Sequence, residues 1–160
     1  VDEAADQVDR AVHKGDELAR PMQRAVRDMM WRSCGVVRDV AGLEAGLAEV
    51  DAIAEAAGEA DVSPNEEGWA DLGHVFDLRA ALLTAWATLL GARAREESRG
   101  AHRRADFPGL DLKLRVAFEI HRDHAGDPRL AAVSPPDVPE RLRAALDAPA
   151  REVTAGRLLE

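Results

Sequence analysis

The chain has 160 residues and a formal net charge of −9; 46% of its residues are hydrophobic and 32% are charged. This size and balance predict one folded domain with one core and exclude a disordered chain. The acidic surplus, without a basic stripe interleaved with aromatic residues, argues against nucleic-acid binding. Cys34 is the only cysteine, which excludes an internal disulfide and favours a reducing compartment.

The chain begins at Val1 and opens with an acidic stretch, so we expect no signal peptide and a longer polypeptide upstream. Residues 2–13 are compatible with a helix, and Gly15 breaks that pattern. A second helix is expected from about Asp16, with Pro21 in its first turns, where a missing N–H costs little.

Apolar residues then recur at alternating steps of four and three. This 3.5-residue period predicts one seam of a left-handed supercoil, with Ser33 as its polar member. Gly58 should end this region, and Ser63-Pro64-Asn65 is typical of a turn. The seam comprises Met22, Val26, Met29, Ser33, Val36, Val40, Leu43, Leu47, Val50, Ala54 and Ala57.

The next helix is expected from about Glu66 to Glu97. It has two apolar seams, so we expect it to be covered on two sides and to lie centrally in a bundle. Its longest apolar run, Leu78 to Ala92, contains Arg79 and is shorter than the roughly 20 residues of a membrane span, so no direct span is expected. One seam holds Leu72, Phe76, Leu83, Ala87 and Leu90, and the other holds Val75, Leu78, Leu82, Ala85 and Leu89.

Beyond Gly100 the period changes to that of a strand, because every second residue from Leu114 to Ile120 is a large apolar one. Residues 125–128 have turn chemistry, and Leu130 to Val133 could return as the partner strand. A short helix from Val138 to Leu146 is expected to follow.

These patterns predict an all-α fold, an up-and-down antiparallel bundle of about three helices, spectrin-repeat-like, with a small C-terminal β-hairpin appendage. We divide the chain into a helical bundle at 1–108, a hairpin and short helix of the same domain at 109–147, and a tail at 148–160. Such an architecture does not by itself indicate a function.

The most informative segment runs from Glu97 to Pro108, where a helix end is followed by a burst of polar residues. Arg99 offers a planar fork of donors suited to carboxylates or carbonyls, and His102 could titrate near neutral pH. From the residues alone, the simplest interpretation is a helix C-cap with local salt bridges.

Glu97-Ser98-Arg99-Gly100-Ala101-His102, followed by Arg104-x-Asp106-Phe107-Pro108, closely resembles the signature in the C-terminal domain of succinate dehydrogenase and fumarate reductase flavoproteins. Further matches occur in the family's order and at sensible spacing from Pro21 onward, although Ala80 replaces the family's usual Asn. They are Pro21-Met22-Gln23, Gly35-Val36-Val37-Arg38, Asn65-Glu66-Glu67-Gly68-Trp69 and Asp77-Leu78-Arg79-Ala80-Ala81-Leu82-Leu83.

The resemblance implies that FAD and the dicarboxylate-handling residues lie in other domains of the intact enzyme. This sequence has no Gly-x-Gly-x-x-Gly fingerprint, so we assign it no catalytic, cofactor-binding or metal-binding residue. Its signature residues are expected to dock against the flavin-binding and capping domains, so that Arg99→Ala would loosen docking and lower activity. The docking residues are Glu97, Ser98, Arg99, Gly100, His102, Arg104 and Asp106.

The intact enzyme would pass electrons to an iron–sulfur subunit and lie in the cytoplasm or peripherally at the cytoplasmic face of a membrane through partner subunits. Surface left bare by the missing domains could make the isolated chain self-associate. Two alternatives stay open. A domain of an L-aspartate oxidase-like flavoprotein would share Ser-Arg-Gly, although Ala101 stands where that branch usually has Leu. A stand-alone helical adaptor would use the bundle to bind proteins.

Overall fold

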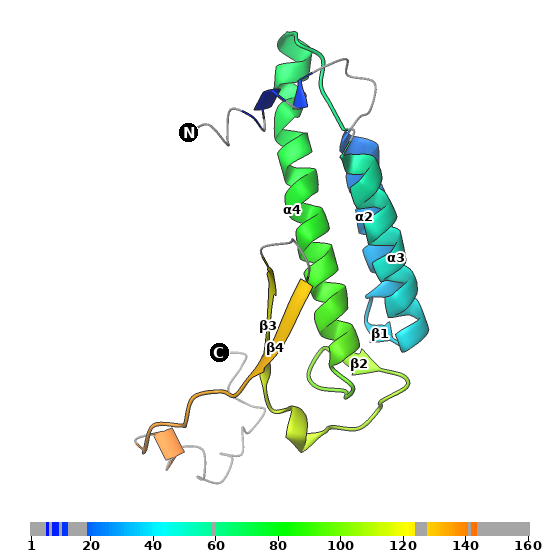
Figure 1. Ribbon diagram of the computed structural model, residues 1–160. Helices are drawn as coiled ribbons and strands as arrows, with labels where there is room; N and C mark the ends of the chain where they lie inside the picture. The colour runs from blue at the N-terminus through cyan, green and yellow to red at the C-terminus, as the bar shows by residue number, and fades with distance from the viewer. Residues whose placement is uncertain are drawn as a thin grey trace, which may run out of the picture.

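The computed structural model describes residues 6, 8, 9, 11, 12, 19–58, 60–123, 128–140, 142 and 143. Within them, three long helices, α2 (Ala19–Ser33), α3 (Val40–Ala57) and α4 (Glu66–Ala94), pack side by side. Their directions alternate along the chain, and a two-stranded hairpin lies against the lower half of α4 (Figure 1). The predicted mostly helical domain with a small strand appendage is therefore confirmed.

The core lies where the three helices meet. Met29 of α2, Leu43 of α3 and Leu78 of α4 are all fully buried. Close approach of the helices depends on Gly46, where a Cβ atom would lie 2.7 Å from Ser33 Cβ and 2.9 Å from Leu89 Cδ2. Ser33 is thus buried, as predicted from its place in the seam. It packs against Gly46, where any larger residue would clash with it.

The continuous seam predicted from Met22 to Ala57 is wrong at its centre, because the chain turns back between α2 and α3. Val36 is 74% exposed and Val40 is 43% exposed, whereas a seam would bury both. The turn runs through strand β1 (Val37–Arg38), and Asp39 then caps α3 by accepting the Gly42 N–H at 2.8 Å. Apolar residues continue at alternating steps of four and three through this turn, although the chain there is not helical.

Helix α4 begins at the predicted Glu66, because the Asn65 side chain caps it by accepting the Gly68 N–H at 2.8 Å. It ends at Ala94, earlier than the predicted Glu97. By length and composition α4 could cross a membrane, yet its seam from Val75 to Leu89 is buried in the bundle.

The second apolar seam of α4 is only half covered, which corrects the prediction that both seams are buried. Hairpin strands β3 (Ala117–Arg122) and β4 (Pro128–Val133) pair antiparallel, with Ile120 opposite Leu130. Ile120 Cδ1 would lie 3.3 Å from a Cβ atom at Gly91, so the hairpin covers the end of the seam. Leu83, farther up, is 48% exposed.

The segment before the hairpin differs from the predicted strand. Residues Leu112–Leu114 form a 3₁₀ turn, η1, because the Asp111 side chain accepts the Lys113 N–H at 2.9 Å. Of the predicted helices at 2–13 and 138–146, only parts are described, and residues 6, 8, 9, 11, 140, 142 and 143 in them are helical. The predicted turn at 125–128 and the tail lie outside the described residues, apart from Pro128.

Candidate docking site

The signature residues gather at the end of the bundle where α4 stops and α3 starts. We call this group the polar cluster. It contains all the residues predicted for docking, and two more arginines join it. Its members are Arg38, Arg95, Glu97, Ser98, Arg99, Gly100, His102, Arg104 and Asp106.

Glu97 is the anionic centre of the polar cluster, and its side chain is fully buried. It accepts hydrogen bonds from Arg99 Nε at 2.8 Å, from Arg95 Nη1 at 2.7 Å and from the Asp111 N–H at 2.8 Å. The Arg99 hydrogen bonds, together with those of Asp111 and Arg95, lower the pKa of Glu97 to about 2 against the effect of burial. The carboxylate is therefore ionised and fully partnered.

Arg104 joins the ends of two helices. Its Nη1 donates to the carbonyls of Ala92, Arg93 and Arg95 at 3.0, 3.1 and 3.2 Å, where α4 leaves its last carbonyls unpaired. Its other nitrogens form a bidentate pair with Asp106 at 2.8 and 2.7 Å. The Arg104 hydrogen bonds lower the pKa of Asp106 to about 2.

Asp106 in turn stabilises the start of α3. One carboxylate oxygen accepts the Val40 N–H at 3.0 Å, and a negative charge at a helix N-terminus is favourable. The chain is also tied here by β1, which pairs in parallel with β2 (Arg103–Arg104). Arg104 and Asp106 thus form one polar bridge from the C-terminus of α4 to the N-terminus of α3.

Ser98 and Gly100 shape the loop. Ser98 Oγ accepts the Arg104 N–H at 2.9 Å and donates to the Phe107 carbonyl at 2.8 Å. Gly100 has a φ of +56°, a conformation that side chains disfavour, in a tight turn where Arg99 and His102 exchange backbone hydrogen bonds. The turn presents Gly100 and Ala101 as an exposed tip.

His102 is held as a neutral ring. Arg38 can only donate, so His102 Nδ1 accepts from it at 2.9 Å, and Nε2–H donates to the Arg95 carbonyl at 3.1 Å. Burial, reinforced by the arginines, lowers the pKa of His102. A lowered histidine pKa contributes stability above the ordinary value of 6.5, and this contribution is lost as the pH falls through the folded-state pKa.

The predicted docking residues are therefore brought together, and most of their hydrogen bonds are made inside the chain. The outward-facing parts are the Gly100–Ala101 tip, part of Asp106 and the Arg99 side chain, which is 36% exposed. Their docking role remains a prediction. Sequence reasoning gave no role to Arg38 and Arg95. Arg38 contacts a ring nitrogen 64 residues away, and Arg95 binds the backbone carbonyls of Leu114 and Val116 in addition to Glu97.

An apolar surface adjoins the tip. Trp31 is 78% exposed, Val36 74% and Val37 57%, values that are high for large apolar side chains. Trp31 and Val36 border a pocket of about 630 Å³ that Ala101 also lines. Cys34 lines the same pocket half-buried, and burial raises the pKa of its thiol, which argues against a reactive thiolate.

The polar cluster should make stability depend on acid. Both carboxyl pKa values fall on folding, from 4.5 for Glu97 and 3.8 for Asp106 to about 2. Their contribution is therefore complete above about pH 4.5 and is lost as the pH falls toward about 2. We expect the urea concentration at the midpoint of unfolding to fall as the pH is lowered across this window.

In Arg99→Gln, the pH at which the Glu97 carboxyl titrates by NMR should rise, while that of Asp106 should not change. An unchanged Glu97 titration would contradict the assignment of Arg99 as its main partner.

The sequence lacks the glycine-rich Gly-x-Gly-x-x-Gly loop with which a dinucleotide-binding strand and helix are joined. In the part of the chain that the structure describes, the parallel strands β1 and β2 have two residues each. Across the described part of the chain, no three His, Cys, Asp or Glu side chains come together as a metal site.

The chain is thus a helical bundle closed at one end by the polar cluster, which carries the signature that resembles the succinate dehydrogenase and fumarate reductase flavoproteins. Comparison with known proteins supports this class. Residues 23–130 match the family described as "Fumarate reductase flavoprotein C-term". The chain belongs to this family.

The individual relatives include both a fumarate reductase and an L-aspartate oxidase. The chain is 28% identical over 123 residues to one component of the fumarate reductase (CoM/CoB) of Methanothermobacter marburgensis, covering 76% of this chain and 22% of that protein. It is 36% identical over 127 residues to L-aspartate oxidase of Rhodospirillum rubrum, covering 79% and 38%. The chain thus spans well under half the length of these relatives.

Solved structures share the fold. A mutant FrdA of the E. coli quinol fumarate reductase aligns with a TM-score of 0.76 at 21% identity, over 88% of this chain and 26% of that one. Sdh1 of Mycobacterium smegmatis in complex with UQ1 aligns with a TM-score of 0.76 at 18% identity, over 91% and 26%.

Proposed function

We propose that this domain serves an FAD-dependent succinate dehydrogenase or fumarate reductase by docking against the flavin-binding and capping domains of the same polypeptide. The observation that carries the proposal is the apolar surface of Trp31, Val36 and Val37 beside the Gly100–Ala101 tip. Solvated apolar residues gathered at one end of a well-packed bundle are typical of a surface that a partner covers.

The polar cluster has a positioning role in this proposal. Because Glu97 and Arg104 are buried and fully partnered, they hold the tip and the start of α3 in one geometry. A rigid docking surface loses less entropy on binding than a mobile one. Arg99, with part of its side chain exposed, is the cluster member best placed to contact the covering domain.

FAD would be held by other domains, since the sequence carries no Gly-x-Gly-x-x-Gly fingerprint. Bound elsewhere in the polypeptide, the flavin would supply the hydride chemistry, and an iron–sulfur subunit would accept electrons. The residues of this chain would keep the flavin domain in position. The docking role must therefore be tested by measuring the intact protein. Its place would be the cytoplasm, or the cytoplasmic face of a membrane through partner subunits.

Docking through the apolar surface can be tested by replacing two exposed tryptophans that lie at opposite ends of the bundle. In the intact flavoprotein, Trp31→Ala should lower the melting temperature and the turnover, because it removes part of the covered surface. In the 160-residue chain the same change should leave the melting temperature nearly unchanged, since Trp31 is 78% exposed. Trp69→Ala, at 54% exposure near the start of α4, is the control and should alter neither protein.

Unchanged turnover and melting of the intact protein carrying Trp31→Ala would refute docking through this surface. Arg99→Ala is less decisive, since Arg99 also partners the buried Glu97 and its loss would disturb the isolated chain too.

The similarity to the Rhodospirillum rubrum enzyme favours one alternative, a domain of an L-aspartate oxidase. The intact protein would then oxidise L-aspartate and need no iron–sulfur partner. Assaying it with succinate and with L-aspartate separates the two proposals.

A further inference from the structure

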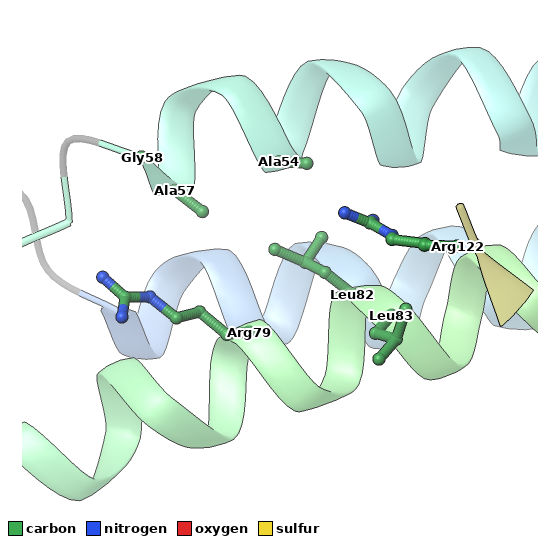
Figure 2. Close-up of a pocket in the computed structure, with 7 residues that line it drawn as sticks. All are labelled: Ala54, Ala57, Gly58, Arg79, Leu82, Leu83 and Arg122. Atoms are coloured by element: carbon green, nitrogen blue, oxygen red, sulfur yellow. The ribbon is translucent and has the colours of Figure 1, made fainter. Parts of the chain in front are cut away.

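A second pocket lies away from the polar cluster, between the end of α3 and the middle of α4. It has a volume of about 340 Å³, and its walls are apolar side chains that include Ala57, Leu82 and Leu83. Two arginines line it, Arg79 from α4 and Arg122 from β3. Figure 2 shows their guanidinium groups on either side of Leu82, with Arg122 reaching into the gap between α3 and α4.

These two arginines differ from those that pair with carboxylates elsewhere in the bundle. Arg20, Arg32 and Arg93 each form an ion pair with a neighbouring helix. Within the part of the chain that the structure describes, neither Arg79 nor Arg122 has a hydrogen-bond acceptor or an ion-pair partner.

Each of the two arginines lies over an aromatic ring. Arg79 Cζ lies 5.8 Å from the centroid of Phe76, and Arg122 Cζ lies 5.6 Å from that of Trp86. A guanidinium stacked on a ring keeps its N–H groups free at the edge of its plane and loses less freedom when it binds an anion. The site is therefore two positioned cations separated by an apolar floor.

The complement of this pattern is a molecule with two carboxylates joined by an aliphatic stretch. A carboxylate matches the guanidinium fork, and the aliphatic part matches Leu82 and Leu83. The C-terminal end of α3, at Ala57 and Gly58, also lines the pocket. Because a helix C-terminus disfavours any anion, both carboxylates should lie at the two arginines and away from this end.

We propose that this pocket binds a dicarboxylate ligand through Arg79 and Arg122, independently of the docking surface. The two carboxylates come either from a free aliphatic dicarboxylic acid or from two glutamates that flank an apolar residue in a protein segment. Both sources present two carboxylates to the two arginines, with an aliphatic stretch between them for the apolar floor.

The test titrates the 160-residue chain with glutarate, adipate and suberate at constant ionic strength, reading the arginine Nε–Hε signals by NMR. Hexanoate is the matched ligand with one carboxylate. We expect one chain length to bind best and hexanoate to bind about fivefold more weakly, as the loss of one exposed ion pair implies. Arg79→Gln and Arg122→Gln should each abolish the difference, whereas Arg24→Gln, which removes an exposed charge on α2, should not.

A peptide with two glutamates around a leucine, and its double-glutamine analogue, distinguish the sources. Tighter binding of the glutamate peptide than of the free acids assigns the site to a protein segment, and the reverse assigns it to a small molecule. Equal binding of adipate and hexanoate, no binding of any probe, or unchanged affinity in both glutamine variants with intact circular dichroism would overturn the proposal.

Discussion

Replacing Arg104 with methionine should destabilise the domain more than any other single side-chain change in the polar cluster. Arg104 is 1% exposed and satisfies three carbonyls at the end of α4 as well as the Asp106 carboxylate. Asp106 is itself partly solvated, so the main loss is that the carbonyls at the buried end of α4 are left without their donor, and an unsatisfied buried polar group costs about 1–3 kcal/mol. This is a large share of the roughly 5–15 kcal/mol of a typical domain, and urea unfolding of the 160-residue chain measures it.

Arg103→Met is the matched control, because Arg103 is the exposed neighbour on the same strand. It should change the free energy of unfolding by less than about 0.5 kcal/mol. A double variant, Arg104→Met with Asp106→Leu, should recover part of the loss, since no unpaired charge remains. Recovery should be incomplete because Asp106 also accepts the Val40 N–H. Equal stability of Arg103→Met and Arg104→Met would show that the pair contributes nothing.

The parts of the fold that local chemistry decides could be predicted from the sequence. Asn65 caps α4 at the expected residue, and the alternation around Phe118 and Ile120 becomes strand β3. The turn between α2 and α3 could not be predicted, because Val36 and Val40 keep the apolar spacing although both are exposed. A period reports which residues are apolar, and it does not show where the chain reverses.

The end of α4 illustrates a second limit. Residues 95–97 are compatible with a helix, but Arg95 leaves it and binds the carbonyls of Leu114 and Val116 at 2.9 and 2.7 Å. These acceptors are backbone atoms about twenty residues away, so no side-chain pattern indicates them. The sequence signature likewise identified seven residues that lie together in the structure. The role of Arg38 was not predicted, because its partner His102 lies 64 residues later in the chain.

Gly68→Ala should be the most damaging substitution that adds one methyl group. Gly68 is buried in the first turn of α4, and a Cβ atom there would overlap the Ser63 carbonyl oxygen and lie 2.8 Å from the Ser63 carbonyl carbon and nitrogen. These are backbone atoms, so the clash cannot be relieved by a side-chain rotation. Moving Ser63 would also disturb Asn65, whose N–H binds the Ser63 carbonyl at 2.8 Å. We expect a loss of about 3 kcal/mol or more.

Gly73→Ala, on the same helix, should change the free energy of unfolding in the opposite direction. Gly73 is exposed, and a Cβ atom there meets nothing within 4 Å, so alanine should raise the free energy of unfolding by about 0.5–1 kcal/mol. Urea unfolding of both variants, followed by circular dichroism, compares the same chemical change at two positions five residues apart. If Gly68→Ala were as stable as Gly73→Ala, the tight approach of Ser63 to α4 would be wrong. The opposite signs would show that close backbone packing, and not helix propensity, requires glycine where α4 begins.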